Sequence, residues 1–210
     1  RTVIGTILSL VVTYCGAYVL TKKSLPFRNL ITLFILFTMF FSGGLIPMYL
    51  LVRNLGFYNK IWALVLPFAI NTFQLIIVRN FFMGIPEEIE ESAKIDGAKD
   101  LFILVRIVLP LSLPILATVT LWSMVYHWNE WFNCMIYMKD EKKYMLQLVL
   151  RRILLEGQQV DAAADSSSAY VNTETMKMAT LVVSILPIIC IYPFLQKYFV
   201  KGVMVGSLKG

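Results

Sequence analysis

Histidine and cysteine often supply catalytic and metal-binding groups, and this sequence contains few of them. The single histidine, His127, lies in the string HWNEW, which lacks the second histidine of a zinc-binding H-E-x-x-H helix. The cysteines Cys15, Cys134 and Cys190 have no C-x-x-C spacing, which indicates packing roles. The sequence also lacks a phosphate-binding G-x-x-x-x-G-K-[ST] loop. We therefore expect no catalytic or metal site and no ATP hydrolysis in this chain, with His127 a polar residue near a membrane interface.

A charged segment lies at residues 87–100, between two apolar stretches. Pro86 suits the first turn of a helix, and the glutamates that follow place negative charge near the positive end of the helix dipole. The Asp96-Gly97 pair is a turn signal that ends this helix. Apolar residues then recur at helical spacing, at Ala98, Leu101, Phe102 and Val105. The sequence predicts a short helix, a glycine corner and a second helix, lying outside the membrane.

The composition of the chain is typical of a membrane protein. Of 210 residues, 58% are apolar and only 15% charged, and the mean hydropathy is +0.72. Five apolar segments approach the roughly 20 residues that cross a bilayer. They lie at residues 3–20, 30–52, 61–82, 108–127 and 178–198. The predicted fold is an all-α polytopic membrane protein with about five transmembrane helices, and the start at Arg1 leads us to expect a missing N-terminal piece.

The net charge of +6 indicates basic residues beside the membrane more than nucleic-acid binding, because dense basic runs with interleaved aromatics do not occur. If the loop 21–29 faces the cytoplasm, so do residues 81–107 and the C-terminal tail. The positive-inside rule leans this way without deciding the orientation. Ten of the nineteen Lys and Arg residues are then cytoplasmic: Lys22, Lys23, Arg28, Arg79, Lys94, Lys99, Arg106, Lys197, Lys201 and Lys209.

The charged segment resembles a known motif. It is similar to the "EAA" loop of permeases in bacterial ATP-binding-cassette (ABC) importers. The match consists of Glu91-Ser92-Ala93, three residues, Gly97, nine residues and Ile107-x-Leu109-Pro110, and only Ser92 departs from the usual pattern. Asp96 and Ala98 also match the sugar-importer version. Stretches at 41–59, 128–137 and 192–210 resemble the maltose-type carbohydrate permeases, so the likeness covers most of the chain.

This resemblance implies a permease subunit of the bacterial cytoplasmic (inner) membrane, crossing it several times as a single domain, 1–210. Family members usually have six spans, so the first would be missing here. The implied partners are a second permease subunit, an ATPase dimer that binds ATP and Mg, an extracytoplasmic substrate-binding protein, membrane lipid and a carbohydrate. The loop 81–110 would be the cytoplasmic coupling loop, 128–177 the outer segment and 196–210 a tail reaching the ATPase. The coupling residues would be Glu91, Ser92, Ala93, Asp96, Gly97 and Ala98.

Polar residues inside or beside the apolar segments are candidates for the substrate pathway, because a polar group in a span normally faces a cavity or another helix. Helix packing is the alternative for the small and amide residues, and an interfacial belt is the alternative for the aromatic ones, such as Trp128 and Trp131. The candidates are Ser42, Tyr49, Asn71, Gln74, Asn129 and Glu130.

Two other classes of protein remain as alternatives at this stage. An ATP-independent channel or secondary carrier is disfavoured because no acidic or basic residue lies deep in an apolar segment, where ion relays usually need one. An intramembrane hydrolase would need a nucleophile with a base, or a metal cluster, and the sequence offers neither. The sequence therefore favours an ATP-driven carbohydrate importer working by alternating access.

Overall fold

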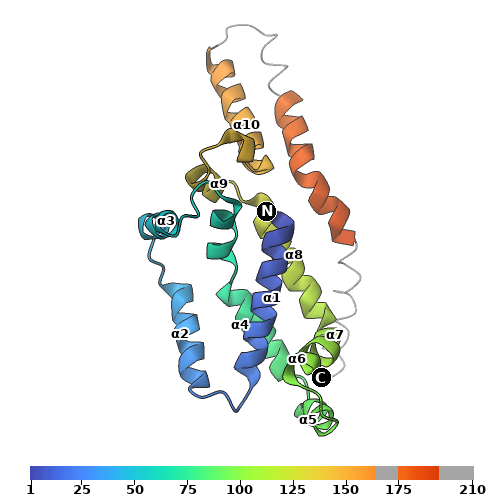
Figure 1. Cartoon of the computed structure of the whole chain (residues 1–210). Coiled ribbons are helices and arrows are strands. Elements are labelled where there is room, and N and C mark those ends of the chain that lie inside the picture. The colour runs from blue at the N-terminus through green and yellow to red at the C-terminus, as the bar shows by residue number, and fades with distance from the viewer. Residues whose placement is uncertain (164–174, 194–210) are drawn as a thin grey trace.

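The computed structural model describes residues 1–163 and 175–193, and every regular element within these ranges is helical. Two helices are each long and apolar enough to cross a bilayer, namely α1 (Thr2–Thr21) and the helix Thr175–Pro193. At 1.5 Å per residue, the 20 residues of α1 extend about 30 Å, the thickness of the hydrocarbon core. These helices correspond to the first and last predicted spans (Figure 1).

The second predicted span, 30–52, is not one continuous helix. α2 (Arg28–Phe40) and α3 (Leu45–Asn54) meet at 112°. The break falls in the loop that contains Ser42 and Gly44, and Gly44 has φ +85°, a conformation that favours glycine. α3 therefore turns sharply away from α2, as Figure 1 shows.

The third predicted span is also bent. The short helices η1 (Ile61–Leu64) and η2 (Leu66–Phe68) precede α4 (Thr72–Met83), and the two parts meet at 47°. Pro67 lies in η2 and cannot donate a backbone hydrogen bond, which interrupts regular helix there. Asn71 then caps the N-terminus of α4. The predicted boundaries hold, but the span consists of two helical pieces.

The fourth predicted span begins later than expected. Residue 108 lies in a π-helix, and α8 (Leu113–Asn129) starts only after Ser112, with Pro114 in its first turn. The preceding helical stretch meets α8 at 89°. If each bent pair is one span, the described residues contain up to five spans. The elements between α4 and α8 are α5 (Glu87–Ile95), α6 (Asp100–Ile103), η3 (Leu104–Val108) and α7 (Leu109–Leu111).

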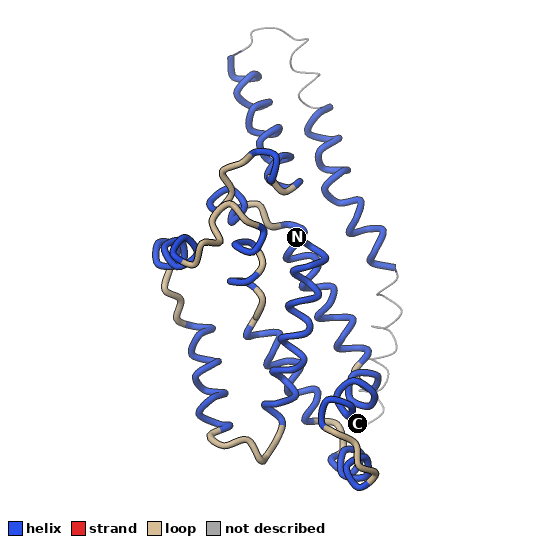
Figure 2. Tube along the Cα trace, viewed as in Figure 1, coloured by secondary structure: helices blue, strands red, loops and turns tan. Residues whose placement is uncertain are grey.

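α1 packs against both α4 and α8 in the centre of the molecule (Figures 1 and 2). Tyr14, Ala17 and Tyr18 of α1 share a buried apolar cluster with Val78 of α4 and Val119 of α8. This cluster also includes Ile103 at the end of α6 and Leu104 and Val108 of η3. α2, by contrast, has no buried residue, so its apolar surface is open to lipid or to another chain.

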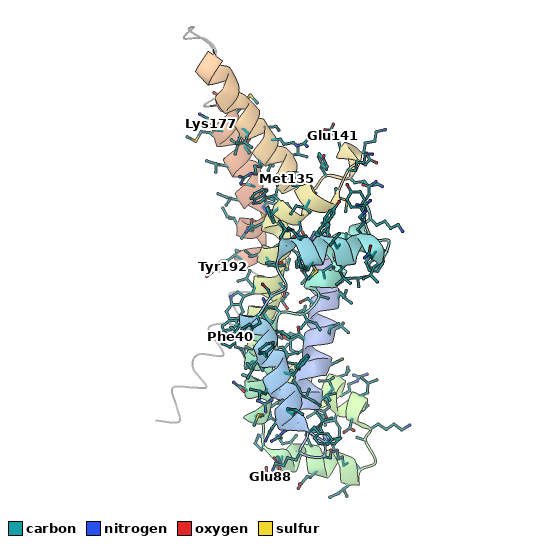
Figure 3. All side chains as sticks on the ribbon, turned by 90° about the vertical axis from the view of Figure 1, so that its left-hand side faces the viewer. Phe40, Glu88, Met135, Glu141, Lys177 and Tyr192 are labelled. Atoms are coloured by element: carbon teal, nitrogen blue, oxygen red, sulfur yellow. The ribbon has the colours of Figure 1, made fainter. Side chains whose placement is uncertain are left out.

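A second buried cluster lies at the other end of the molecule. It joins α3 and η1 to the segment after α8, and Cys134, Tyr137 and Leu148 are among its members. The elements of this segment are α9 (Phe132–Tyr137), η4 (Glu141–Lys143) and α10 (Leu146–Ala163). α5 and α10 lie at opposite ends of the molecule, as do Glu88 and Glu141 in Figure 3.

Candidate functional site

The glycine corner after α5 has the predicted form. Gly97 has φ +84°. Its N–H donates to the carbonyl of Lys94 at 3.0 Å, and the N–H of Ala98 donates to the carbonyl of Ala93 at 2.9 Å. This pair of hydrogen bonds is the Schellman motif, which satisfies the last carbonyls of a helix. The chain therefore leaves α5 at a fixed angle and enters α6 after Lys99.

The glutamates of α5 divide into two pairs. Glu87 and Glu90 form ion pairs with Lys23 and Lys22, in the loop that follows α1. Glu88 and Glu91 are exposed, and neither forms an ion pair with any residue that the structure describes. Positions 88 and 91 are three apart and share a helix face. This face leaves two carboxylates open to a partner, including the glutamate of the EAA-like motif.

The other motif residues of α5 have different surroundings. Ala93 is buried in the central cluster, and Ala98 packs against it, so these two positions attach α5 to the bundle. Ser92 is exposed and its hydroxyl donates to the carbonyl of Ile89 at 3.1 Å. Asp96 is exposed at the C-cap. The sequence reading did not single out Ile95, whose 87% exposure makes it an unusually open apolar side chain.

Asn71 and Gln74 line one polar pocket that is partly open to the surface, where Asn71 is exposed. The side-chain oxygen of Asn71 accepts from the N–H of Gln74 at 3.1 Å, which makes Asn71 the N-cap of α4. The buried hydroxyl of Ser123, on α8, donates to the Gln74 side-chain oxygen at 3.1 Å. The pocket has a volume of about 110 Å³, enough for several water molecules. The full lining is Ser9, Pro67, Phe68, Ile70, Asn71, Gln74, Ser123, Tyr126 and His127.

His127 is a buried residue of α8. Its ring lies against the backbone of Gly5, since a Cβ built on Gly5 would be 2.7 Å from the His127 Cε1 atom. Its Nδ1 atom has no hydrogen-bond partner among the described residues. His127 therefore serves helix packing and lines the polar pocket, and its position near a membrane interface stays a prediction.

Glu130 has a structural role in the isolated chain. Its side chain accepts from the N–H of Asn133 at 2.8 Å and lies 3.9 Å from the guanidinium of Arg1. The Arg1 side chain is 1% exposed, and its Nε atom donates to the carbonyl of Leu64 at 2.9 Å. These contacts join α1, η1 and the end of α8. Glu130 is thus held away from the polar pocket of Gln74.

The remaining pathway candidates are dispersed. Tyr49 stacks on Tyr137 with ring centroids 6.1 Å apart, in the second buried cluster. Ser42 is exposed in the break between α2 and α3, and Asn129 is exposed at the end of α8. Of the six predicted pathway residues, Asn71 and Gln74 line the same pocket.

The tryptophans beside Asn129 make specific contacts. The indole N–H of Trp128 donates to the carbonyl of Ser184 at 2.8 Å, which attaches the helix Thr175–Pro193 to α8. The guanidinium of Arg151 lies 3.6 Å from the ring centroid of Trp131, a cation–π contact between α10 and the segment before α9. Trp128 and Trp131 therefore hold helices together, and this role is compatible with a place in an interfacial aromatic belt.

Metal-ligating residues are scattered over the part of the chain that the structure describes, where no three His, Cys, Asp or Glu side chains could hold a metal ion together. Cys134 is buried, and its sulfur accepts from the N–H of Met145 at 3.3 Å. Burial raises the pKa of the Cys134 thiol, which lowers the thiolate fraction available for reaction.

These features define an α-helical membrane protein with a charged helix–corner–helix at one end. The family described as "Binding-protein-dependent transport system inner membrane component" matches residues 5–205, and the chain belongs to this family. The resemblance seen in the EAA-like spacing is thereby confirmed, and the chain is a permease subunit of an ABC importer.

Relatives from Bacillus subtilis (strain 168) match the whole chain. The polygalacturonan/rhamnogalacturonan transport system permease protein YtcP is 46% identical over 211 residues, which cover 100% of this chain and 74% of YtcP. Protein LplC is 45% identical, over 100% of this chain and 71% of LplC. A chain in the crystal structure of a bacterial ABC transporter that imports the acidic polysaccharide alginate is 37% identical. Its TM-score is 0.83, with 94% of this chain and 71% of that chain covered.

Proposed function

We propose that this chain is one half of a multi-pass permease that imports a carbohydrate across the bacterial inner membrane. It pairs with a second permease subunit, and a separate ATPase dimer binds ATP and Mg and supplies the energy. A substrate-binding protein delivers the sugar at the outer end. Residues 1–210 form a single permease domain, in which the polar path alternates between the two sides of the membrane.

The observation that carries this proposal is the geometry of α5 and its corner. Gly97 turns the chain through a left-handed conformation, and Ala93 attaches α5 to the bundle. Glu91 and Ser92 remain exposed. A short helix attached on one side and polar on the other suits docking to an ATPase subunit, so residues 81–110 act as the coupling loop.

The proposed orientation places α5 in the cytoplasm and the segment 128–177 outside. α10 extends from the end opposite α5 and offers a surface to a substrate-binding protein (Figure 1). The predicted tail contact, residues 196–210 with the ATPase, lies outside the described residues and stays a prediction. Its test is a chain that ends at Tyr198, with assembly and transport measured.

The pocket of Asn71 and Gln74 is the best-supported part of the substrate pathway. Amide and hydroxyl groups line it together with the rings of Phe68 and Tyr126, and none of its lining residues is acidic, lysine or arginine. Such a lining can hydrogen-bond sugar hydroxyls and offer aromatic surface to a sugar ring. YtcP is named for polygalacturonan/rhamnogalacturonan transport, and the transporter in the crystal structure imports the acidic polysaccharide alginate, which supports a carbohydrate as the cargo.

The experiment is reconstitution of the complete transporter in proteoliposomes with ATP inside and labelled galacturonan or alginate oligosaccharides outside with the binding protein. We expect uptake that stops when the ATP is replaced by a non-hydrolysable analogue. Uptake without ATP hydrolysis would instead support the alternative, an ATP-independent channel or secondary carrier.

The pathway assignment has its own test. Gln74→Leu removes the amide that bonds Ser123 but keeps a similar volume, so uptake should fall while the ATPase still co-purifies. Ser42→Ala is the control, because Ser42 is exposed in the α2–α3 break and does not line the pocket. Equal uptake by both variants would assign Gln74 to helix packing alone.

A further inference from the structure

We infer that the ion pair between Lys22 and Glu90, covered by Tyr18, fixes α5 to the end of α1 so that the two helices move as one body. This inference rests on the proposed coupling role of α5. It assigns Lys22 and Glu90 as positioning residues within the permease, distinct from the exposed glutamates that face a partner.

Lys22 is attached firmly to α1. It is the C-cap of that helix, and its N–H donates to the carbonyl of Val19 at 3.2 Å. Its ammonium group pairs with the carboxylate of Glu90 and lies 3.7 Å from the ring centroid of Tyr18. The Tyr18 hydroxyl donates to the same carboxylate at 3.5 Å. One cation, one aromatic ring and one carboxylate therefore form a connected contact between α1 and α5.

The neighbouring pair of Lys23 and Glu87 provides a comparison within the same loop and helix. Its side chains are 74% and 64% exposed, whereas those of Lys22 and Glu90 are 19% and 23% exposed. Water screens the exposed pair, and such pairs contribute little. The shielded pair interacts in a lower effective dielectric and is held by Tyr18, so it can restrain the position of a helix.

α5 has few other attachments to the bundle. Ala93 is its only residue classed as buried, and an alanine side chain gives a small contact. α5 is bounded by Gly84 and Gly97, which lie in the turns at its two ends. The apolar contact of Ala93 prevents α5 from lifting away, and the Lys22–Glu90 pair, one turn from it, restrains rotation and sliding along α1. Displacement of α5 by a docked partner is then transmitted directly to α1, which packs on α4 and α8.

The first measurement does not depend on the identity of the sugar. Spin labels are attached at Val11→Cys in α1 and Ile95→Cys in α5, both exposed positions, with Cys15 and Cys190 replaced by alanine. In the complete transporter in lipid nanodiscs, pulsed electron resonance gives the distribution of distances between them. We expect a narrow distribution that broadens with Lys22→Gln and with Glu90→Gln.

Two variants distinguish positioning from general destabilisation. Lys22→Arg keeps a cation next to Tyr18 and Glu90, and should keep the distribution narrow. Lys23→Gln removes the exposed pair and should leave it unchanged. An unchanged distribution in Lys22→Gln, or equal broadening in Lys23→Gln, would overturn the inference.

The functional measurement is oligosaccharide uptake per ATP hydrolysed. We expect this ratio to fall about fivefold in Lys22→Gln, as for loss of one partly shielded ion pair, and to recover in Lys22→Arg. If the unaltered transporter takes up no oligosaccharide, the proposed function is contradicted. The inference about Lys22 and Glu90 is then still tested by the distance measurement. A normal ratio in Lys22→Gln would overturn transmission through this contact.

Discussion

The backbone of Gly97 is in the left-handed region, and the space where a Cβ would be added is open. The cost of substitution is therefore torsional, about 1–3 kcal/mol for a β-branched residue. We predict that Gly97→Val leaves a membrane-inserted permease whose ATPase co-purification and uptake are reduced. Gly97→Asn is the matched control, because asparagine adopts this conformation more easily. An equal loss of co-purification and uptake in both variants would show that any side chain at position 97 is harmful, whatever its backbone preference.

A second residue-scale prediction concerns Glu91, which is exposed and forms no ion pair among the described residues. Glu91→Ala should change the stability of the permease by less than about 0.5 kcal/mol. It should weaken ATPase docking by about 2–5 kcal/mol, since a charged hydrogen bond in the interface is lost. Glu141→Ala, which removes an exposed glutamate at the opposite end of the molecule, should retain the ATPase. Normal co-purification in Glu91→Ala would remove this residue from the coupling surface.

At the scale of elements, α1 and α8 approach closely where Gly5 faces His127. A Cβ on Gly5 would lie 2.7 Å from the imidazole, which is buried and cannot move aside easily. We predict that Gly5→Ala destabilises the chain by about 1–3 kcal/mol through overpacking, and lowers the thermal unfolding temperature in detergent.

Gly16→Ala on the same helix is the control. Its added Cβ would lie 3.2 Å from a terminal methyl of Leu75, a flexible group that can adjust. Removing a helical glycine is also favourable by up to about 1 kcal/mol. Gly16→Ala should therefore be neutral or stabilising. An equal unfolding temperature for both variants would mean that the α1–α8 contact is looser than this geometry indicates.

The whole molecule has two ends of different character, with α5 at one and η4 and α10 at the other (Figure 1). We predict that a membrane-impermeant thiol reagent labels Lys142→Cys in intact cells but labels Lys99→Cys only after permeabilisation. Both positions are exposed, so any difference in their labelling reports which side of the membrane each one faces. Cys15 and Cys190 are replaced by alanine to remove background. Labelling of Lys99→Cys in intact cells would reverse the proposed orientation.

The sequence by itself determined the class of fold, the positions of the apolar segments and the helix–glycine–helix form of residues 87–103. Apolar length and the Asp96-Gly97 turn signal are local properties, so they can be read without knowing which helices pack together. The left-handed backbone of Gly97 and the helix α5 before it are two features predicted from such local signals. The EAA-like spacing was local as well, which is why the family could be recognised from residues 91–110.

Only the tertiary structure decided which polar residues come together. Asn71 caps α4 and shares a pocket with Gln74, and Glu130 pairs with Arg1, which the sequence alone does not reveal. The sharp bends within the predicted spans were also missed, because hydropathy reports length and not direction. The pairing of Lys22 with Glu90 joins residues 68 positions apart. Such contacts depend on how α1, α4 and α8 pack, and packing is a property of the whole chain.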